Sequence, residues 1–297
     1  MNSVIAVVVT YNRLSMLKKC LKALNKQNYK CDILVVDNNS SDGTSEWLLE
    51  NSGEYKFKYL NTGSNIGGAG GFNIGLKYAK QNGYKFVWLM DDDCIPDSEA
   101  LFKLIEADKE LKGVYGWLSS KCLWIDGNLC PMNIQRKNPY TKIKDYKTPL
   151  VEAQMASFVS LFIKISVVRK YGLPIKEFFI WSDDWEYTRR ISKKIKCYVV
   201  NNSIVTHAMK NNSIVNIATD AEERLERYKY FYRNDVYLYR REGVKGWIWL
   251  FLKDVWHTMK TMKTGKFSRI FIIWKGFFTG IKFSNRTYNI EDNDERK

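Results

Sequence analysis

Short apolar runs alternate with segments of helical apolar spacing through the first ninety residues. The runs at 4–9 and 33–36 are continuous and rich in β-branched residues, which is typical of strands buried on both faces. Leucines recur every three or four residues over 14–24, which predicts a helix. In chain order the expected elements are a strand at 4–9, a helix at 14–24, a strand at 33–36, a helix at 42–49, a strand at 57–60, a glycine-rich turn at 67–71 leading into a helix through 79, and a strand at 86–90. This order predicts an α/β fold with a doubly wound, mostly parallel sheet.

The pattern after residue 93 is less regular. We expect a helix at 98–111, strands at 114–125, 157–165 and 197–200, a strand-like segment at 204–206, and a turn that becomes a helix within 181–195. From residue 221 onward the chain reads as about three helical segments, with breaks expected at Gly243, Gly246 and Gly265. We therefore expect a catalytic domain at 1–215, a helical region at 216–297, and fraying of the polar residues 290–297.

The charge of the chain is concentrated in this helical region. The net charge is +15, and the segment 240–286 holds eleven Lys and Arg residues against only Glu242 and Asp254. Such a charge implies an anionic partner, which could be a membrane surface, a nucleic acid or a phosphorylated substrate. The same segment holds ten aromatic residues, and Lys and Arg mixed with Trp and Phe on helices favour a membrane interface. Ordinary scaffold helices with solvated lysines are the alternative, and nucleic acid is disfavoured because no recognition motif accompanies the charge.

Cysteine usage and hydropathy suggest a protein of the cytoplasm. The six cysteines form no C-x-x-C pair and no Cys/His group with the spacing of a zinc site, so we expect free thiols. The N-terminus has no basic segment before its apolar run, and no stretch of eighteen uncharged apolar residues occurs. We expect neither a secretory signal nor a spanning helix.

Polar residues follow each of the first four predicted strands. The first strand leads into Thr10, Asn12 and Arg13, the second into Asp37 and the residues after it, and the third into Asn61 and Asn65. In open α/β sheets, ligands bind beyond the carboxyl ends of the strands. Turn or capping chemistry could explain any one group, above all residues 38–41, but four groups at one sheet edge predict a ligand site in residues 1–95.

Three adjacent carboxylates, Asp91, Asp92 and Asp93, follow the fourth strand and are the most informative element of the sequence. Adjacent carboxylates repel one another, and a bound divalent cation removes that penalty. Because alternate residues project alike, Asp91 and Asp93 could share one ion while Asp92 points elsewhere. Oxygen ligands suit Mg²⁺ or Mn²⁺. An acidic cap of the following helix is the alternative, but capping needs only one acid, and Asp97 or Ser98 supplies it.

A second acidic group begins the predicted helix near residue 183. Asp183 and Asp184 could cap that helix, or one of them could be a general base that faces the metal site. His207 follows the strand-like segment 204–206 and is either a structural histidine or a further metal ligand.

The glycines at 67–71 do not match the dinucleotide fingerprint, because the third glycine would fall on Asn73. They would instead let the backbone approach a ligand or a neighbouring turn.

These residues, in this order, resemble family 2 glycosyltransferases of the GT-A fold, over about two-thirds of the chain. The most specific part is the segment 65–72, NIGGAGGF, followed by WLMDDD at 88–93, which is similar to galactofuranosyl- and rhamnosyltransferases of bacterial surface polysaccharides. DDWEY at 183–187 resembles the acceptor-side motif of the galactofuranosyl enzymes, and the later pair Arg233 and Asn234 is similar to the same branch. The polymerising members are longer, so the resemblance favours the addition of a single sugar.

The resemblance implies a role for each matching position. It implies an inverting, metal-dependent transferase that takes a UDP- or dTDP-linked sugar and gives it to a saccharide, as a rule linked to polyprenyl diphosphate, at the inner face of the cell membrane. Asp184 would be the catalytic base. The other implied roles are nucleotide binding by Thr10, Asn12, Arg13, Asp37 and Asn65, sugar contacts by Asp92, Trp181 and Asp183, and metal binding by Asp91, Asp93 and His207.

Two other functions stay open on the sequence alone. A sugar-nucleotide-binding scaffold without activity is one, although Asp91, Asp93 and Asp184 are all present. A nucleotidyltransferase is the other, although no glycine-rich basic loop for a triphosphate lies near the N-terminus.

Overall fold

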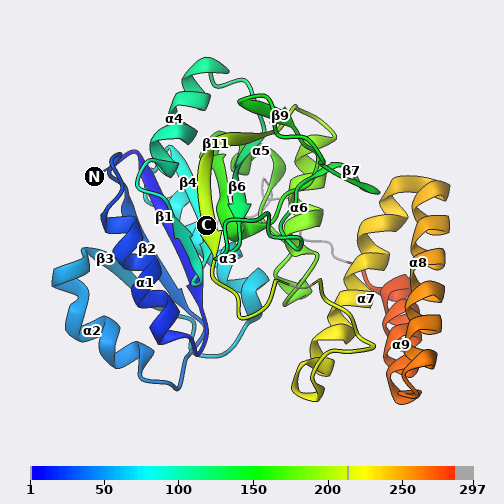
Figure 1. The fold of residues 1–297 in the computed structure, drawn as a ribbon. Helices are drawn as coiled ribbons and strands as arrows, with labels where there is room; N and C mark the ends of the chain where they lie inside the picture. The colour runs from blue at the N-terminus through cyan, green and yellow to red at the C-terminus, as the bar shows by residue number, and fades with distance from the viewer. Residues whose placement is uncertain (1, 213, 285–297) are drawn as a thin grey trace, which may run out of the picture.

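A mixed sheet with helices on both faces forms the body of the computed structural model, which describes residues 2–212 and 214–284, the side chains of residues 52, 54 and 55 excepted (Figure 1). The expected frayed tail at 290–297, and Arg286 of the basic segment, lie outside these residues. The strand order is β3-β2-β1-β4-β10-β6-β11-β5, with β9 beside β11. The strands are β1 (Val4–Thr10), β2 (Asp32–Asp37), β3 (Phe57–Asn61), β4 (Phe86–Asp91), β5 (Cys94–Pro96), β6 (Trp117–Leu123), β9 (Leu150–Glu152), β10 (Leu161–Lys164) and β11 (Tyr198–His207), with a separate small ribbon of β7 (Arg136–Asn138) and β8 (Thr141–Lys142).

The four N-terminal strands run parallel, as the alternating pattern predicts. β1 pairs with β2 and β4, and β2 pairs with β3, all in parallel. β10 is antiparallel to both of its neighbours, so the sheet changes direction beside β4. The predicted α/β class with a mostly parallel sheet is confirmed.

Alternate side chains of β1 pack into two separate hydrophobic cores, one on each face of the sheet. Val4, Ala6 and Val8 pack with α1 (Leu14–Asn25), α2 (Thr44–Tyr55) and α4 (Ala100–Glu110) on one face of the sheet. Ile5, Val7 and Val9 face α3 (Gly67–Gln81), α5 (Ile165–Tyr171) and α6 (Asp183–Ser192) on the other. Because every residue of β1 is buried, its continuous apolar run is explained.

The glycines at 67–71 lie inside helix α3, so the predicted glycine-rich turn is wrong in form. A Cβ atom at Gly71 or Gly75 would lie 2.6 or 2.3 Å from a methyl group of Val9 or Val7. The glycines therefore let α3 pack directly against β1. Gly67 has a φ of +74°, and a Cβ there would lie 2.0 Å from the main-chain oxygen of Phe179. The expected approach to a neighbouring turn is thus present, and that turn is the one before α6.

The strands predicted at 197–200 and 157–165 have different ends in the structure. The segments 197–200 and 204–206 form one strand, β11, with a register shift between Val200 and Ile204. Only the second half of 157–165 is a strand, because Phe158–Ser160 forms a 3-10 turn. The bulge lets β11 continue to His207, which pairs with Cys94 of β5.

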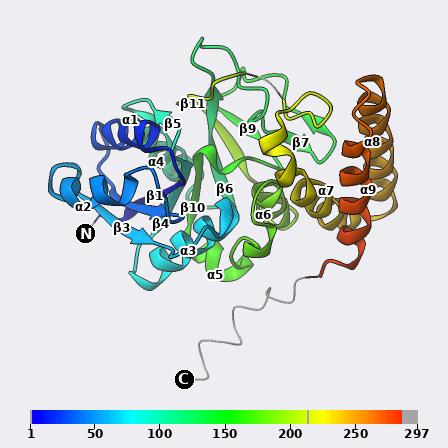
Figure 2. The same cartoon turned by 90° about the horizontal axis from the view of Figure 1, so that it is seen from below.

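Three helices form the C-terminal part of the described chain and stand side by side beyond α6 (Figures 1 and 2). They are α7 (Leu225–Tyr239), α8 (Gly243–Lys263) and α9 (Ser268–Lys282). Gly243 begins α8 and Gly265 separates α8 from α9, as expected, but Gly246 lies within α8. A Cβ at Gly246 would lie 1.9 Å from the main-chain oxygen of Tyr239, so close packing, not a break, requires this glycine.

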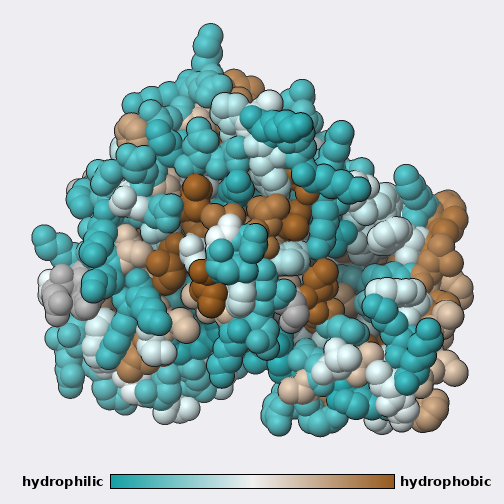
Figure 3. Space-filling view, in the orientation of Figure 1, coloured by the Kyte–Doolittle hydropathy of each residue, from teal (hydrophilic) through white to brown (hydrophobic). Residues whose placement is uncertain are grey.

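The outer face of α8 carries exposed apolar side chains, and they form a brown strip along one edge of the molecule in Figure 3. Eight residues at helical spacing make up this apolar face: Val244, Ile248, Trp249, Phe251, Leu252, Trp256, Met259 and Met262. No helix among the described residues is long and apolar enough to cross a membrane.

Part of the basic charge of this region is used internally. Lys253 forms ion pairs with Asp235 and Asp254, and the Arg269 side chain is buried against main-chain oxygens and Glu222. Arg240 donates to main-chain oxygens at the C-terminal end of α9. The lysines that remain exposed are Lys245, Lys263, Lys266, Lys275 and Lys282, with Lys260 partly exposed. The cationic surface is therefore smaller than the residue count suggests.

Candidate active site

Asp91, Asp93 and His207 meet at the carboxyl end of β4. Asp91 ends that strand, and the pairing of β5 with β11 brings His207 across from Cys94. One ligand atom from each of the three residues lies within 4.8 Å of the others. His207 Nε2 is 2.9 Å from Asp93 Oδ1. The structure therefore gathers the three residues that the sequence analysis assigned to a metal.

The orientation of His207 is fixed from its other nitrogen. Nδ1 lies 2.8 Å from Asn133 Oδ1, and the amide group of Asn133 donates from Nδ2 to Ser157 Oγ at 2.9 Å. Because the amide oxygen can only accept, the imidazole proton belongs on Nδ1. Burial favours the neutral ring, but the hydrogen bond with Asp93 outweighs it and raises the pKa of His207 to about 10, so Nε2 carries a second proton toward the carboxylates. A cation would replace that proton and use the Nε2 lone pair, which is how metal-binding histidines are commonly oriented.

Asp92 points to a different place from its neighbours. Its carboxylate accepts a 2.7 Å hydrogen bond from Thr10 Oγ1, and both groups are buried. The guanidinium of Arg13 contacts Asp93 and lies 3.5 Å from Asp92. Thr10 and Arg13 thus contact the acidic group itself.

The electrostatics of this group favour a cation. Burial, and then the negative charge of Asp93, raise the pKa of Asp91 to about 6 and that of Asp92 to about 7. Burial also opposes ionisation of Asp93, but His207 and Arg13 outweigh it and lower the pKa of Asp93 to about 2. Among the described residues, the three carboxylates lie beside only two cationic groups, the Arg13 guanidinium and the His207 imidazolium. Two carboxylates and an imidazole in mutual reach are suitable ligands for Mn²⁺ or Mg²⁺, so the residues present fit a divalent cation.

The remaining residues assigned to the nucleotide line the same sheet edge. Asn12 is exposed, and its Oδ1 accepts from Ser41 N at 2.7 Å. Asn65 is also exposed and accepts from Gly67 N at 2.9 Å. Asp37 is fully buried and accepts hydrogen bonds from Ser40, Ser45 and Tyr59. Asn12 and Asn65 are open to a ligand, whereas the Asp37 carboxylate is already well satisfied by hydroxyl groups.

Asp183 and Asp184 open helix α6 and face the same region. Asp183 is buried and Asp184 is half-buried. Burial raises the pKa of both carboxyls, to about 7 for Asp183 and well above the usual range for Asp184, and the charge of Asp91 adds to both shifts. The two acids therefore lie within electrostatic reach of Asp91. A carboxylate with a raised pKa is a better proton acceptor than an ordinary one.

The segment before α6 has a strained backbone. Phe179, Trp181 and Ser182 have φ values of 64°, 63° and 64°, which favour glycine. The Trp181 ring packs edge-on against Tyr228 and Phe231 of α7, at centroid distances of 5.2 and 5.9 Å. Trp181 is therefore held by α7 and is not a freely moving side chain.

Asn234 of α7 stabilises this segment. Its Nδ2 donates to the main-chain oxygens of Phe178, Ile180 and Trp181 at 3.0, 3.2 and 2.8 Å. The neighbouring Asp235 accepts a 2.6 Å bond from Ser182 Oγ. Three positive φ values are sustained here because α7 supplies several hydrogen bonds at once.

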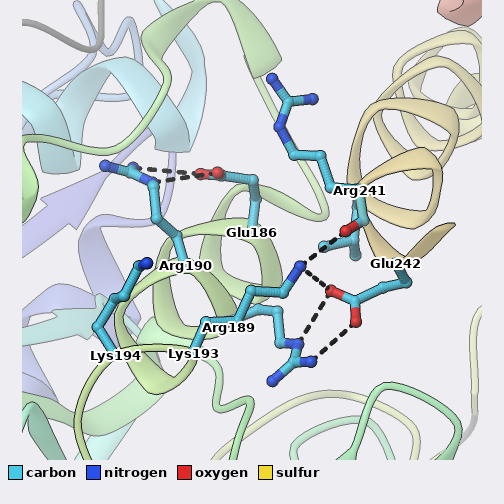
Figure 4. Close-up of a pocket in the computed structure, with 8 residues that line it drawn as sticks. Glu186, Arg189, Arg190, Lys193, Lys194, Arg241 and Glu242 are labelled. Carbon is cyan, nitrogen blue, oxygen red and sulfur yellow. Dashed lines mark hydrogen bonds and ion pairs between the residues drawn. The ribbon is translucent and has the colours of Figure 1, made fainter.

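A pocket of about 270 Å³ lies at the other end of α6 (Figure 4). Arg189 binds Glu242 through two hydrogen bonds of 3.0 and 2.8 Å, and Lys193 lies 2.7 Å from the same carboxylate. Arg190 binds Glu186 on its own helix. The pairs that Arg189 and Lys193 form with Glu242 join α6 to the start of α8. Both ends of α6 are therefore attached to the C-terminal helices.

Sequence reasoning did not find Asn133, or the cysteines Cys122 and Cys130 that lie beside His207. Asn133 lies in the irregular segment between β6 and β7, where no periodicity or motif marks it. Asn234 was noted only as part of a resemblance, and its contact with the segment before α6 joins residues more than fifty positions apart.

Comparison with known proteins identifies the domain in the N-terminal half of the chain. The model of glycosyl transferase family 2 matches residues 5–149, which include β1 to β4, the three aspartates and the start of the irregular segment. The chain contains a family 2 glycosyltransferase domain. Galactofuranosyltransferase GlfT1 of Mycobacterium tuberculosis is 29% identical over 64% of this chain, and the aligned part is 64% of that relative's length. The GalNAc(5)-diNAcBac-PP-undecaprenol beta-1,3-glucosyltransferase of Campylobacter jejuni is 35% identical over 35% of this chain and 34% of its own.

Solved structures of glycosyltransferases share the fold of this family 2 domain. The mannosyltransferase PcManGT of Pyrobaculum calidifontis, in complex with GDP-Man and Mn²⁺, aligns with a TM-score of 0.56 at 14% identity, over 94% of this chain and 73% of that chain. The predicted GT-A fold with a helical C-terminal region is thereby confirmed. At this identity the likeness shows the fold alone.

Proposed function

We propose that this protein is an inverting glycosyltransferase that moves one sugar from a nucleotide-sugar donor to a saccharide acceptor. The observation that carries the proposal is the meeting of Asp91, Asp93 and His207 at one edge of the sheet, within electrostatic reach of Asp183 and Asp184. The family 2 domain supports it independently. Galactofuranose is the favoured sugar, because GlfT1 is 29% identical over 64% of this chain. UDP is then the favoured nucleotide, and rhamnose on dTDP is the second choice.

The donor would lie along the carboxyl ends of β1 to β4. Thr10, Asn12, Arg13, Asp37 and Asn65 would hold the nucleotide, and Asp92 would contact the ribose or the donor sugar. Asp91, Asp93 and His207 would hold Mn²⁺ or Mg²⁺, which offsets the charge that develops on the departing diphosphate. In this arrangement Arg13 would exchange its contact with Asp93 for one with phosphate oxygens.

Asp184 would be the general base. It would take the proton of the acceptor hydroxyl, and the oxygen would attack the anomeric carbon on the side opposite the diphosphate, which inverts the configuration there. Trp181 and Asp183 would contact the sugars. Burial, and then the charge of Asp183 beside it, raise the pKa of Asp184, which makes its ionised carboxylate a stronger proton acceptor than an ordinary one.

The acceptor we propose is a saccharide on a polyprenyl diphosphate, reached from an anionic membrane surface. The name of the Campylobacter relative contains such an acceptor, a saccharide on PP-undecaprenol. The exposed apolar face of α8 and the lysines around its end give a surface suited to peripheral attachment. The surface polysaccharide of a bacterium is the product class that follows. Nucleic acid is not a proposed partner.

A donor panel with lipid-linked acceptors tests the function. The full chain is incubated with each nucleotide sugar, and release of nucleoside diphosphate and the mass of the lipid product are measured. Transfer from UDP-galactofuranose, lost with excess chelator and restored by Mn²⁺ or Mg²⁺, is the expected result. Release of pyrophosphate would show a nucleotidyltransferase instead. Binding of donors without turnover on any acceptor would favour a scaffold that holds sugar nucleotides.

A further inference from the structure

Two thiols lie on the side of His207 away from the aspartates. Cys122 is near the end of β6, and the chain returns through a turn so that Cys130 N donates to the main-chain oxygen of Cys122 at 3.2 Å. The two sulfur atoms and a ring nitrogen of His207 all lie within 4.8 Å of one another. Cys130 is fully buried, and Cys122 and His207 are each only 6% exposed.

The amide oxygen of Asn133 also points into this group. It lies 3.0 Å from Cys130 Sγ and 2.8 Å from His207 Nδ1, while the amide nitrogen is engaged by Ser157. Two sulfurs, one imidazole nitrogen and one amide oxygen therefore converge in a buried space. Packing in an apolar core would not require these four atoms to meet. Sulfur and imidazole are the ligands of Zn²⁺ and similar thiophilic cations.

We propose that Cys122, Cys130 and Nδ1 of His207 form a binding site for a thiophilic divalent cation, Zn²⁺ in chemical class, with Asn133 Oδ1 as the fourth ligand. The cation takes the place of protons. The thiol protons of Cys122 and Cys130 pass to solvent, and the doubly protonated His207 ring loses its Nδ1 proton to solvent and keeps the one on Nε2. Four ligands of this kind match a closed tetrahedral site.

This site competes with the one formed by the aspartates. A hard cation on Asp91 and Asp93 needs the lone pair of His207 Nε2 and the proton on Nδ1. A thiophilic cation on Nδ1 leaves the proton on Nε2, 2.9 Å from Asp93 Oδ1. His207 cannot serve both ions as a neutral imidazole, so Zn²⁺ at the thiol site weakens binding of Mn²⁺ or Mg²⁺ at the other. This consequence rests on the proposed function, whereas binding of the thiophilic ion does not.

Co²⁺ is the probe for binding, because a thiolate ligand gives cobalt a near-ultraviolet charge-transfer band that oxygen ligands do not. The full chain, reduced with a phosphine that does not bind metals, is titrated with Co²⁺. We expect a band that saturates near one equivalent and is displaced by Zn²⁺. Cys130→Ser and Cys122→Ser should each remove the band or weaken binding about tenfold or more. Cys197→Ser, a buried thiol in a different core cluster, is the matched control and should leave it unchanged.

Failure of the serine variants to fold would not block the test, because X-ray absorption of wild-type protein loaded with Zn²⁺ needs no substitution. Two sulfur neighbours at about 2.3 Å are expected. Only oxygen and nitrogen neighbours, or no cobalt band in wild type, would overturn the proposal. In the assay of transfer with Mn²⁺, Zn²⁺ should inhibit wild type and the Cys197→Ser control but not the double Cys122→Ser/Cys130→Ser variant. If the transferase proposal fails, the assay gives no signal, and the cobalt titration still decides whether the site exists.

Discussion

Asn234 Nδ2 donates a hydrogen bond of 2.8 Å to the main-chain oxygen of Trp181. This bond joins helix α7 to a backbone segment that has three positive φ values and leads directly into Asp183 and Asp184. The main-chain oxygen of Phe179 in the same segment accepts from Ala69 N of α3 at 3.1 Å. The segment is thus held from the proposed donor side by α3 and from the other side by α7, so the position of the proposed base depends on the C-terminal helices.

Replacing Asn234 by alanine should slow transfer more than it weakens donor binding. The variant loses three donated bonds to a strained segment, and loss of buried hydrogen bonds costs on the order of 1–3 kcal/mol. A small displacement of Asp184 should lower kcat on the order of ten- to a hundredfold. Steady-state kinetics with a varied donor would show kcat reduced and the KM for donor nearly unchanged.

Asn82→Ala is the matched control for this variant. Its Nδ2 also donates to a main-chain oxygen, that of Tyr78 at 2.8 Å, but at the exposed end of α3. It should leave kcat at the wild-type value. If Asn234→Ala loses stability in urea yet keeps full kcat, Asn234 has a structural role alone and the segment does not need α7 for its active shape.

Asp184→Asn should remove the proposed general base while keeping the shape of the side chain. Loss of a general base lowers rate by about 10²- to 10⁴-fold, and donor affinity should change little. Burial and the charge of Asp183 raise the Asp184 pKa, and the base acts only when ionised. Wild-type kcat should therefore rise with pH through an apparent pKa above the ordinary aspartate range. A variant with near-normal turnover would move the base to Asp183 or Glu186.

The first four strands were predictable because their chemistry is local. A run such as Val4–Thr10 can be buried only between two layers of helices, and the polar residues after it must then lie at the edge of the sheet. The repulsion between adjacent carboxylates is also local, and the cation that it predicts at Asp91 and Asp93 stays a prediction. The glycines of α3 were misread as a turn, because their cause is the close packing of Gly71 and Gly75 against β1, which no local pattern reveals.

Contacts between distant segments could not be predicted from the sequence. The two cysteines and Asn133 reach His207 only because β6 and β11 are neighbours, across more than seventy positions of chain. No spacing rule for zinc ligands covers such a group. The sequence presents the basic residues near the C-terminus as one block of charge, but in the structure Lys253 is partly buried in ion pairs and Arg269 is buried in hydrogen bonds. Burial of this kind depends on how helices pack, which residue counts do not contain.

His257 should make the C-terminal helices sensitive to acid. Its Nδ1 lies 2.9 Å from the hydroxyl group of Tyr232, and burial, with the nearby charge of Lys253, lowers its pKa to about 4. An unfolded chain would bind a proton near pH 6.5. The stability that depends on neutral His257 is therefore complete above pH 6.5 and is lost as the pH falls toward 4, by on the order of 3 kcal/mol.

Urea unfolding of wild type and His257→Gln across pH 7.5 to 4.5 checks this expectation. Other groups that titrate in this range, including Asp254, whose pKa burial raises to about 6, are shared by both proteins, so the difference between the two curves isolates His257. Wild type should lose its advantage over the variant as the pH falls. Parallel curves would mean that His257 titrates in the folded protein as it does in the unfolded chain.

The lysines at the end of α8 should attach the protein to anionic bilayers. Lys260, Lys263 and Lys266 lie beside the apolar face of α8, and the ammonium of Lys260 is 3.6 Å from the ring centroid of Trp256. Each basic residue near an anionic surface contributes on the order of 1 kcal/mol, and salt screens the contribution. Replacing all three by glutamate should weaken binding to anionic vesicles strongly at low salt, with nucleotide binding unchanged.

Lys22→Glu/Lys26→Glu/Lys30→Glu is the matched control for that charge reversal. These three exposed lysines lie in and just after α1, at the opposite end of the molecule from α8 in Figure 1. The control makes the same change in net charge, so equal loss of vesicle binding in both variants would point to overall charge and not to α8. Sedimentation with vesicles over a salt series separates the two cases.

Binding of wild-type protein to vesicles should fall with salt to a residual level set by Trp256 and its apolar neighbours. Trp256→Ser should lower that residual level. A wild-type protein that ignores anionic vesicles at low salt would make the face of α8 unavailable to a bilayer, and the acceptor would then have to reach the site without help from a docked enzyme.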